Sequence, residues 1–407
     1  MSVRYRLQCP ADAIEARAQA LAVEQSIEMP IEAVRDARVR AEIVGEVLAI
    51  EPSPEAADRF DVVLALAVET TGDEPGQLLN VVFGNCSLQP DVELVDVELP
   101  AAMLAKLPGP RFGIEGWRRA LAGGAPPHDD TDAASPVAGA GRDAEARPLS
   151  CTALKPQGLD ALALADLAYV FARSGIDVIK DDHGIADQAS APFAQRVPLV
   201  QRAIERANRE KCSAGGALSG HRSIYAPTLS GGPRRLAAQL AIARDEGVGA
   251  LLCCPMIVGV PAFTELVRAE AEVPLLAHPA LAGNVRIAPP LLLGKLFRLF
   301  GADATIFPNW GGRFRHSRSD CLAIARRARE ALGTHRPTLP VPAGGLRVDR
   351  VDEIVRAYGP DTMLLIGGDL LRAGDALAAR AAEFAQRVAR ALHPARAADV
   401  GTEAVDG

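Results

Sequence analysis

The sequence predicts an α/β protein: an N-terminal α+β domain of ferredoxin-like type, followed by a C-terminal (β/α)8 TIM barrel. Three observations lead to this prediction. The chain has 407 residues, which is more than one average domain needs. Residues 123–146 are rich in Pro, Gly, Asp and Ala and contain almost no large apolar residue. After them, eight short apolar runs alternate with amphipathic segments, which is the repeat number of a (β/α)8 barrel.

The first domain is expected over residues 1–122. Two strand–helix–strand patterns follow one another there, and this order is typical of an α+β sandwich. The predicted strands are 3–7, 39–50, 60–68 and 92–99, and the predicted helices are 11–23 and 75–82. Residues 123–146 cannot bury enough surface to offset the entropy of ordering them, so we expect a flexible linker there.

The barrel is expected over residues 147–395, with a disordered tail at 396–407. A Rossmann fold is the alternative, but no G-x-G-x-x-G motif follows a predicted strand. The predicted barrel strands are 151–155, 176–181, 223–228, 249–255, 274–278, 304–308, 339–343 and 362–367. Helical segments between them include 162–173, 233–245, 289–300 and 320–332.

Composition excludes several classes of protein. The chain has 44 Lys and Arg against 51 Asp and Glu, and no basic stripe with interleaved aromatic residues, which argues against a nucleic-acid partner. The longest uncharged stretch, 247–264, contains two prolines and is better explained as a buried strand with its loop than as a membrane span. The first ten residues have no apolar signal core. Seven scattered cysteines without a C-x-x-C motif indicate reduced thiols, so we expect a cytoplasmic protein.

Barrel enzymes carry their active sites at the carboxyl ends of the strands. The second predicted strand ends in Lys180, Asp181, Asp182 and His183. Residues i and i+2 of a strand face the same side, so Lys180 and Asp182 both point inward. One interpretation is a buried Lys–Asp ion pair that holds the barrel together. The other is that Lys180 reacts with carbon dioxide to form a carbamate, which together with Asp182 supplies the oxygen ligands that suit Mg²⁺.

Two further strand ends carry titratable side chains. Lys155 ends the first strand and is either a catalytic base or a cation for phosphate. His278 ends the fifth strand and is either a structural residue or a group for proton transfer or substrate binding.

Glycine pairs follow the seventh and eighth strands, where barrel enzymes commonly bind phosphate through bare backbone N–H groups. We therefore predict a phosphate site there, with two tight turns as the alternative. The pairs are Gly344 with Gly345 and Gly367 with Gly368.

At this point the pattern resembles the RuBisCO large-chain superfamily. The similarity is carried by four segments: Phe83-Gly84-Asn85, residues 109–114, residues 152–156 and residues 176–182. The resemblance implies a head-to-tail homodimer in which each active site combines one barrel with the partner's N-terminal domain. By the same resemblance, Glu24 and Asn85 are supplied across that interface, and Lys180 is a carbamate that binds one Mg²⁺ per barrel.

The departures from the family pattern are equally informative. The loop after the sixth strand, residues 309–313, lacks the lysine that carboxylation requires. Gln157, Pro279 and Ala343 also replace residues that hold the second phosphate or polarise carbon dioxide. The chain is therefore similar to the RuBisCO-like proteins, form IV, which do not fix carbon. The family's third metal ligand is a glutamate, and here it is His183, which puts the metal in question; we still expect Mg²⁺.

The remaining groups suit stabilisation of an enediolate beside a carbonyl. The loop after the sixth strand resembles that of the sugar-acid subgroup, with Asn309 as a substrate-binding residue and Arg313 as a fork for a carboxylate. We therefore expect decarboxylation of 3-oxo-isoapionate 4-phosphate. The alternatives are an enolase or isomerase acting on a methylthio-ketose phosphate in methionine salvage, and a sugar-phosphate-binding protein without catalysis.

Overall fold

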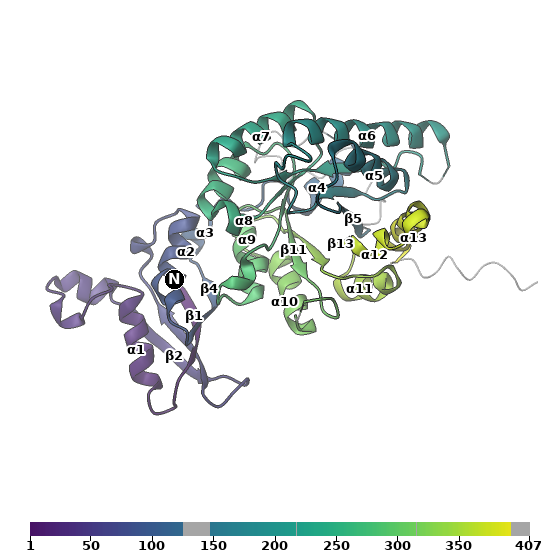
Figure 1. The fold of residues 1–407 in the computed structure, drawn as a ribbon. Coiled ribbons are helices and arrows are strands. Elements are labelled where there is room, and N and C mark those ends of the chain that lie inside the picture. The colour runs from purple at the N-terminus through teal and green to yellow at the C-terminus, as the bar shows by residue number, and fades with distance from the viewer. Residues whose placement is uncertain (125–146, 217, 315, 392–407) are drawn as a thin grey trace, which may run out of the picture.

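The computed structural model describes residues 1–124, 147–216, 218–314 and 316–391. The expected linker lies outside these residues apart from its first two glycines, and the expected tail lies wholly outside them. A smaller N-terminal domain stands beside a larger barrel domain (Figure 1). Within the described residues, no helix has both the length and the apolar character needed to cross a membrane.

The N-terminal domain is a four-stranded antiparallel sheet with the order β2-β3-β1-β4. One face of the central strand is buried, with Val3, Tyr5 and Leu7 fully covered. The Tyr5 hydroxyl donates to the backbone carbonyl of Val82 at 2.7 Å, which ties a helix to the sheet. The elements are β1 (Ser2–Gln8), β2 (Glu46–Pro52), β3 (Arg59–Ala65), β4 (Val92–Glu98), α1 (Ile14–Glu24) and α2 (Pro75–Phe83).

The predicted strand over 39–50 is wrong in its first half. Val39–Ile43 forms a helical turn, η2, and β2 begins only at Glu46. Val39 and Ile43 are four residues apart, which is a helical spacing, and Arg, Ala and Glu between them favour a helix. Gly45 lies between the two elements. A side chain does not fit at this position, because a Cβ would lie 2.6 Å from the carbonyl oxygen of Ala22.

The barrel strands lie close to their expected positions. Prolines interrupt the ladder of backbone hydrogen bonds around the barrel. The strands therefore form two hydrogen-bonded sheets, of order β12-β11-β10-β9-β8 and β13-β5-β6-β7. Pro227 splits the third strand into β7 and β8, and Pro340 and Pro342 lack the N–H groups that β12 would offer to β13. The Thr362 hydroxyl instead donates to the Pro340 carbonyl at 3.1 Å, which closes the barrel. The strands are β5 (Leu149–Leu154), β6 (Val178–Asp181), β7 (Ile224–Ala226), β8 (Thr228–Leu229), β9 (Leu251–Cys253), β10 (Leu275–Ala277), β11 (Ala304–Pro308), β12 (Leu339–Ala343) and β13 (Met363–Leu365).

Helices surround these strands, and local signals set several of their starts. The side chains of Asp160 and Ser317 cap α5 and α10 by accepting backbone N–H bonds, and Pro233 opens α7. The α-helices are α3 (Ala101–Leu104), α4 (Gly113–Leu121), α5 (Ala161–Arg173), α6 (Phe193–Ala214), α7 (Pro233–Asp245), α8 (Pro255–Val258), α9 (Phe297–Leu299), α10 (Arg318–Arg329), α11 (Val351–Tyr358), α12 (Gly368–Leu371) and α13 (Leu377–Arg390). Shorter or wider turns are η1 (Ile31–Ala33), η3 (Val68–Thr70), η4 (Asn85–Leu88), η6 (Ala262–Arg268), η7 (Ala282–Asn284), η8 (Pro290–Leu296), η9 (Val348–Arg350) and η10 (Gly374–Ala376).

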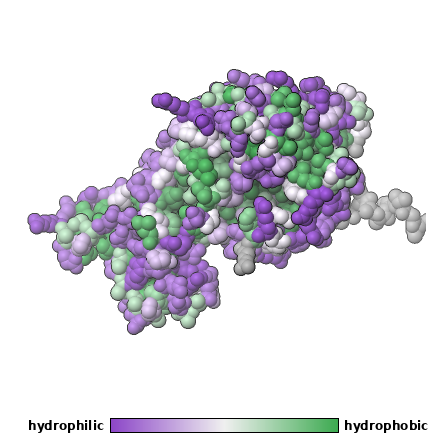
Figure 2. Space-filling model, in the orientation of Figure 1, coloured by the Kyte–Doolittle hydropathy of each residue, from purple (hydrophilic) through white to green (hydrophobic). Residues whose placement is uncertain are grey.

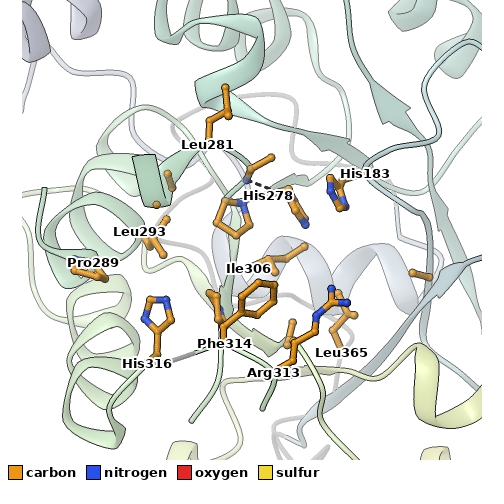
Figure 3. A pocket seen from close by; sticks show the side chains of 18 of the residues that line it. His183, His278, Leu281, Pro289, Leu293, Ile306, Arg313, Phe314, His316 and Leu365 are labelled. Carbon is orange, nitrogen blue, oxygen red and sulfur yellow. Dashed lines mark hydrogen bonds between the residues drawn. The ribbon is translucent and has the colours of Figure 1, made fainter. Parts of the chain in front are cut away.

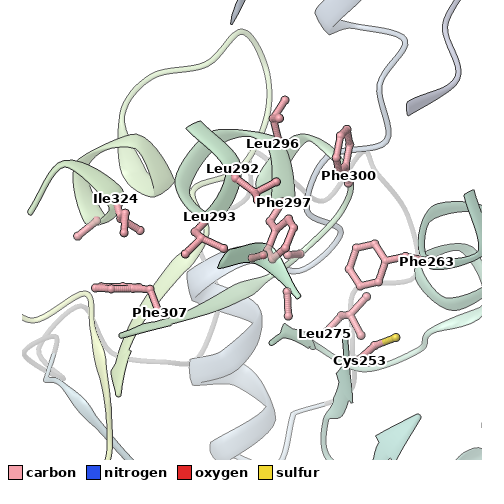
Figure 4. Packing of buried hydrophobic residues seen from close by; sticks show 14 of the residues in the cluster. Cys253, Phe263, Leu275, Leu292, Leu293, Leu296, Phe297, Phe300, Phe307 and Ile324 are labelled. Carbon is pink, nitrogen blue, oxygen red and sulfur yellow. The ribbon is translucent and has the colours of Figure 1, made fainter. Parts of the chain in front are cut away.

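Two apolar layers stabilise the barrel. Trp117 of α4 is fully buried against the inward-facing strand residues, so α4 packs against the barrel interior. The carboxylate of Asp303 accepts the backbone N–H groups of Phe112 and Gly113, both at 2.7 Å, and so fixes the start of α4. Outside the strands, Phe263, Phe297 and other large side chains fill the layer beneath the helices (Figure 4).

The two domains share backbone hydrogen bonds. Leu94 of β4 donates to the carbonyl of Arg286 at 2.9 Å and accepts from Ala288 at 2.8 Å. Lys295 and Arg327 of the barrel both pair with Asp96 at the end of β4. The barrel segment after β10 is therefore held by the sheet of its own N-terminal domain, and this segment forms one wall of the site described next.

Candidate active site

A cavity of about 400 Å³ opens at the carboxyl ends of the barrel strands (Figure 3). It has a polar region and an apolar wall. All the residues predicted to be catalytic or metal-binding line its polar region, and so does Arg313, which was predicted to bind substrate. The predicted catalytic and metal-binding residues are Lys155, Lys180, Asp182, His183 and His278. The apolar wall consists of Leu281, Ile287, Pro289, Leu292, Leu293, Ile306, Phe314 and Leu365.

The alternation of β6 places Lys180 and Asp182 in the cavity and turns Asp181 away from it. Asp181 is fully buried and accepts hydrogen bonds from Arg196, the Tyr225 hydroxyl and the backbone N–H of Thr228. It is a structural acceptor that ties β6 to α6 and to the third strand. Lys180 and Asp182 are each only 3% exposed.

The carboxylate of Asp182 pairs with Lys155, and not with Lys180 as one interpretation of the sequence expected. It also accepts from the side chain of Gln157 at 3.3 Å and from the backbone N–H of Gly184 at 3.1 Å. Burial by itself would raise the pKa of the Asp182 carboxyl, but the nearby Lys155 and Lys180 hold it below the ordinary value. The carboxylate is therefore ionised and available as an anionic ligand.

Within the described residues, Lys180 forms no ion pair with a carboxylate. Its Nζ donates to the backbone carbonyl of Asp181 at 2.9 Å. Burial lowers the pKa of the Lys180 amine, because an ammonium is costly to bury. The neutral amine is the form that reacts with carbon dioxide, so the environment of Lys180 favours carbamate chemistry.

The two histidines lie against each other. The ring of His183 stacks on the ring of His278, and Nδ1 of His183 lies 3.5 Å from Oδ1 of Asp182. Nδ1 of His278 accepts a hydrogen bond from the backbone N–H of Ala280 at 3.1 Å (Figure 3). Burial, with Lys180 and His183 adding to it, lowers the pKa of His278 to about 2, and burial also lowers the pKa of His183.

This donor set fits a divalent ion once Lys180 carries a carbamate. A separation of 3.5 Å between Asp182 Oδ1 and His183 Nδ1 suits two ligands of one ion with bonds of about 2.1 Å. As unmodified side chains, the residues that the structure describes form no group of three His, Cys, Asp or Glu able to hold a metal. The carbamate would therefore be the third ligand, as the resemblance implies.

Of the four glycines predicted to bind phosphate, Gly344 lines the cavity. Gly344 and Gly345 follow β12 with φ of 85° and 104°, a conformation that favours glycine. Gly367 lies beside the aliphatic stem of Lys155 and precedes Gly368 at the start of α12. Within the described chain, the backbone N–H groups of all four glycines donate to no protein acceptor. Free backbone N–H groups can bind a phosphate, and the phosphate site at these glycines stays a prediction.

Of the two residues predicted in the loop after β11, one lines the cavity and one does not. Arg313 lines it, with its guanidinium 4.9 Å from the centre of the Phe314 ring. Asn309 is fully buried: its Oδ1 accepts from the Tyr358 hydroxyl at 2.6 Å and its Nδ2 donates to the Trp310 carbonyl. Asn309 therefore does not line the cavity, and its role in binding substrate stays a prediction.

Glu24 and Asn85 lie together on the N-terminal domain. Asn85 Nδ2 donates to Glu24 Oε1 at 3.4 Å, which joins the end of α1 to η4. Neither residue lines the barrel cavity of its own chain. Their role in a partner's site remains a prediction.

The sequence analysis did not identify His316 or the apolar wall. His316 also lines the cavity, and burial lowers its pKa. The one available signal was position, because His316 follows β11 and most of the wall follows β10, both at the functional end of the barrel. Pro289, Leu292 and Leu293 were expected only as part of a helix, and Ile306 and Leu365 only as parts of strands.

The fold and the site together define a class of barrel proteins. An antiparallel α+β domain is joined to a (β/α)8 barrel, and a buried lysine and an aspartate two residues apart lie at the end of the second barrel strand. Residues 141–404 match the ribulose bisphosphate carboxylase large chain, catalytic domain. The chain belongs to the RuBisCO large-chain family and, within it, to the RuBisCO-like proteins of form IV.

Two relatives and one solved structure illustrate this membership. Ribulose bisphosphate carboxylase-like protein 1 of Rhodopseudomonas palustris is 50% identical, covering 95% of this chain and 97% of the relative. The 5-methylthioribulose-1-phosphate isomerase of Rhodospirillum rubrum is 46% identical, covering 95% and 96%. A crystal structure of a Rubisco-like protein from Rhodopseudomonas palustris aligns with a TM-score of 0.82 and 44% identity, covering 96% of this chain and 97% of that one.

Proposed function

We propose that this protein is an isomerase acting on a methylthio-ketose phosphate of the 5-methylthioribulose 1-phosphate type. The observation that carries the proposal is the division of the cavity into an apolar wall and a polar region. Such a substrate has a phosphate and a carbonyl at one end and an apolar thioether at the other. The Rhodospirillum rubrum relative supports the same reaction by its name.

The isomerase, which was an alternative in the sequence analysis, replaces the decarboxylase that we expected there. A keto sugar acid is polar along its whole length, and burying its hydroxyl groups against Leu292 and Leu293 would leave them without partners. A methylthio group gains from the same contact by about 0.8 kcal/mol per buried methylene equivalent. Arg313, which suggested a carboxylate, lies over the ring of Phe314 and remains available for a phosphate or a hydroxyl group.

The residues have distinct proposed roles. The four glycine N–H groups bind the phosphate end. Lys155, whose amine is positioned by the carboxylate of Asp182, moves the proton to and from the carbon beside the carbonyl. A divalent ion such as Mg²⁺, held by carbamylated Lys180, Asp182 and His183, would supply positive charge next to the carbonyl oxygen. In an isomerisation the proton leaves one carbon and returns to another, so no group is lost.

The test is direct turnover. Purified protein is incubated with 5-methylthioribulose 1-phosphate, bicarbonate and a divalent ion, and the products are followed by ³¹P and ¹H NMR. We expect an isomeric ketose phosphate with no release of carbon dioxide. Inertness toward this substrate, together with carbon dioxide release from 3-oxo-isoapionate 4-phosphate, would restore the decarboxylase.

A matched pair of variants examines the apolar wall. Phe314 and Leu162 are both exposed, at 47% and 64%, but only Phe314 borders the cavity. Phe314→Ala is expected to raise KM on the order of tenfold, which corresponds to about 1.4 kcal/mol of lost apolar contact. Leu162→Ala should leave KM unchanged. Equal effects of the two substitutions would remove the support that the wall gives to a thioether substrate.

We also propose a homodimer with shared active sites. The Glu24–Asn85 pair bears polar groups that its own cavity does not use. Leu88, three residues after Asn85, is 83% exposed. Hydrophobic residues also interrupt the mainly hydrophilic surface that is visible in Figure 2. An exposed large apolar side chain beside unused polar groups suits contact with a second copy of this chain.

A further inference from the structure

The loop after β11 begins with a buried group of hydrogen bonds at Asn309. The backbone N–H of Asn309 donates to the carbonyl of Ala343 at 2.9 Å, which continues the pairing of β11 with β12. Its side-chain Oδ1 accepts the hydroxyl of Tyr358 at 2.6 Å, and its Nδ2 donates to the carbonyl of Trp310 at 3.1 Å. Asn309 is fully buried and Tyr358 is 3% exposed, so water does not compete for the bond between them. Burial raises the pKa of the Tyr358 hydroxyl, which therefore stays protonated and donates.

The end of the loop is bonded to the turn after β12. The backbone N–H of Arg313 donates to the carbonyl of Gly344 at 3.0 Å. Gly312 lies so close to the same carbonyl that a Cβ would be 2.3 Å from its oxygen, so only glycine allows this approach. Both ends of the loop are therefore joined by backbone hydrogen bonds to β12 and its turn.

Two charged side chains at the start of α11 hold the middle of the loop. Arg350 donates from Nη1 to the carbonyls of Trp310 and Gly311 at 3.3 and 3.4 Å. The carboxylate of Glu353 accepts from Arg350 and, at 3.3 Å, from the indole Nε1 of Trp310. The ring of Trp310 also lies 5.3 Å from the ring of Tyr358. Arg350 and Glu353 are partly exposed, where ion pairs contribute little, so the buried hydroxyl of Tyr358 is the stronger anchor.

These contacts lie outside the cavity, yet the loop carries two of the side chains that line it, Arg313 and Phe314 (Figure 3). Tyr358 itself does not line the cavity. We infer that Tyr358 is a positioning residue, which fixes the loop after β11 through Asn309 so that Arg313 and Phe314 stand in place before a substrate binds. The identity of the substrate that meets these two side chains rests on the proposed function. A wall that is already in place binds substrate more tightly, because no loop has to be ordered on binding.

The state of the loop is measured without substrate. The chain has two tryptophans, Trp310 in the loop and Trp117 buried inside the barrel, so protein labelled with fluorotryptophan should give two ¹⁹F NMR signals. Loss of one signal in Trp310→Phe assigns them. We expect a single narrow Trp310 signal in the wild type and a broadened or divided one in Tyr358→Phe, with the Trp117 signal unchanged in both. Because this measurement needs no substrate, it stands or falls separately from the proposed isomerase.

Two further variants test whether the hydrogen bond to Asn309 is responsible. Tyr169→Phe is the matched control, because it also removes a hydroxyl that is bonded to a side chain, that of Glu210, but in the helix that follows β5. It should leave the Trp310 signal unchanged. Asn309→Ala removes the same bond from the other side, so it should broaden the signal, and adding Tyr358→Phe to it should change nothing further. A Trp310 signal that stays narrow in Tyr358→Phe, or is already broad in the wild type, would overturn the inference.

Turnover separates the positioning of the wall from a purely structural role. With any substrate that the protein converts, Tyr358→Phe should raise KM by up to about tenfold, the effect of one hydrogen bond, and leave kcat nearly unchanged. Tyr169→Phe should alter neither constant. A lowered melting temperature of Tyr358→Phe with an unchanged KM would show that the hydroxyl serves only the stability of the fold.

Discussion

The rings of His183 and His278 stack with their centroids 4.0 Å apart and with 12° between their planes. His183 follows β6 and His278 follows β10, so the stack joins two strand ends that are distant in sequence. It places a proposed metal ligand directly against a second histidine that lines the same cavity.

The imidazole of His183 should alter which divalent ion binds. A nitrogen ligand favours Mn²⁺ or Co²⁺ over Mg²⁺, relative to the carboxylate that the family pattern has at this position. We expect His183→Glu to shift the ratio of Mn²⁺ to Mg²⁺ affinity toward Mg²⁺ by about tenfold. Competition titrations followed by the Mn²⁺ electron paramagnetic resonance signal measure the ratio in bicarbonate buffer.

His316→Gln is the control for the metal experiment, because His316 lines the same cavity but is not paired with Asp182. It should leave the affinity ratio unchanged. A ratio that stays the same in His183→Glu as well would mean that His183 does not bind the ion.

Lys180 should matter for activity more than for stability. Its Nζ has a single hydrogen bond, to a backbone carbonyl, so Lys180→Met should cost no more than about 2 kcal/mol of unfolding free energy while abolishing turnover. Breaking a buried ion pair would cost about 3–5 kcal/mol. Denaturant unfolding and turnover of the two proteins separate these cases, and a large stability loss with retained activity would contradict the catalytic role.

Bicarbonate should activate the wild-type protein if Lys180 forms a carbamate. After the protein is stripped of carbon dioxide and metal, readdition of bicarbonate with Mg²⁺ is expected to restore turnover. Mass spectrometry after alkylation of the carbamate should find Lys180 heavier by the mass of carbon dioxide together with that of the added alkyl group. Indifference to both additions would disprove the carbamate.

Shared active sites predict complementation between two inactive variants. Asn85→Ala damages the site of the partner subunit, and Lys180→Ala damages the site in its own barrel. In a mixed dimer one of the two sites keeps both residues, so a freely exchanging mixture should recover about a quarter of wild-type activity. Mixtures shown by mass spectrometry to have exchanged subunits, yet still inactive, would argue against the shared site.

Carbon fixation should be absent. The loop over 309–313 has no lysine, and Arg313 is the one basic residue in it. Protein given ribulose bisphosphate, Mg²⁺ and labelled bicarbonate is expected to incorporate no acid-stable label above an enzyme-free control. Steady incorporation would contradict assignment to the RuBisCO-like proteins.

The sequence by itself determined the order of the elements and the side on which the chemistry lies. Apolar runs of strand length predicted the barrel, and the i, i+2 spacing of Lys180 and Asp182 predicted that both line its interior. These inferences succeed because strand alternation and the common direction of parallel strands are local or generic properties. The predicted start of β2 is too early because the apolar residues Val39 and Ile43 belong to a single helical turn, in which they lie four residues apart.

Only the tertiary structure decided which groups meet. Asp182, which follows β6, pairs with Lys155, which follows β5. Asn309 accepts a hydrogen bond from the Tyr358 hydroxyl of α11. His183 stacks on His278. The part of the apolar wall that follows β10 is held in place by hydrogen bonds to Leu94 of the N-terminal sheet. Each of these contacts joins residues from different elements, and closure of the barrel sets their distances. No periodicity within one element contains that information, because it depends on how separate strands and domains pack together.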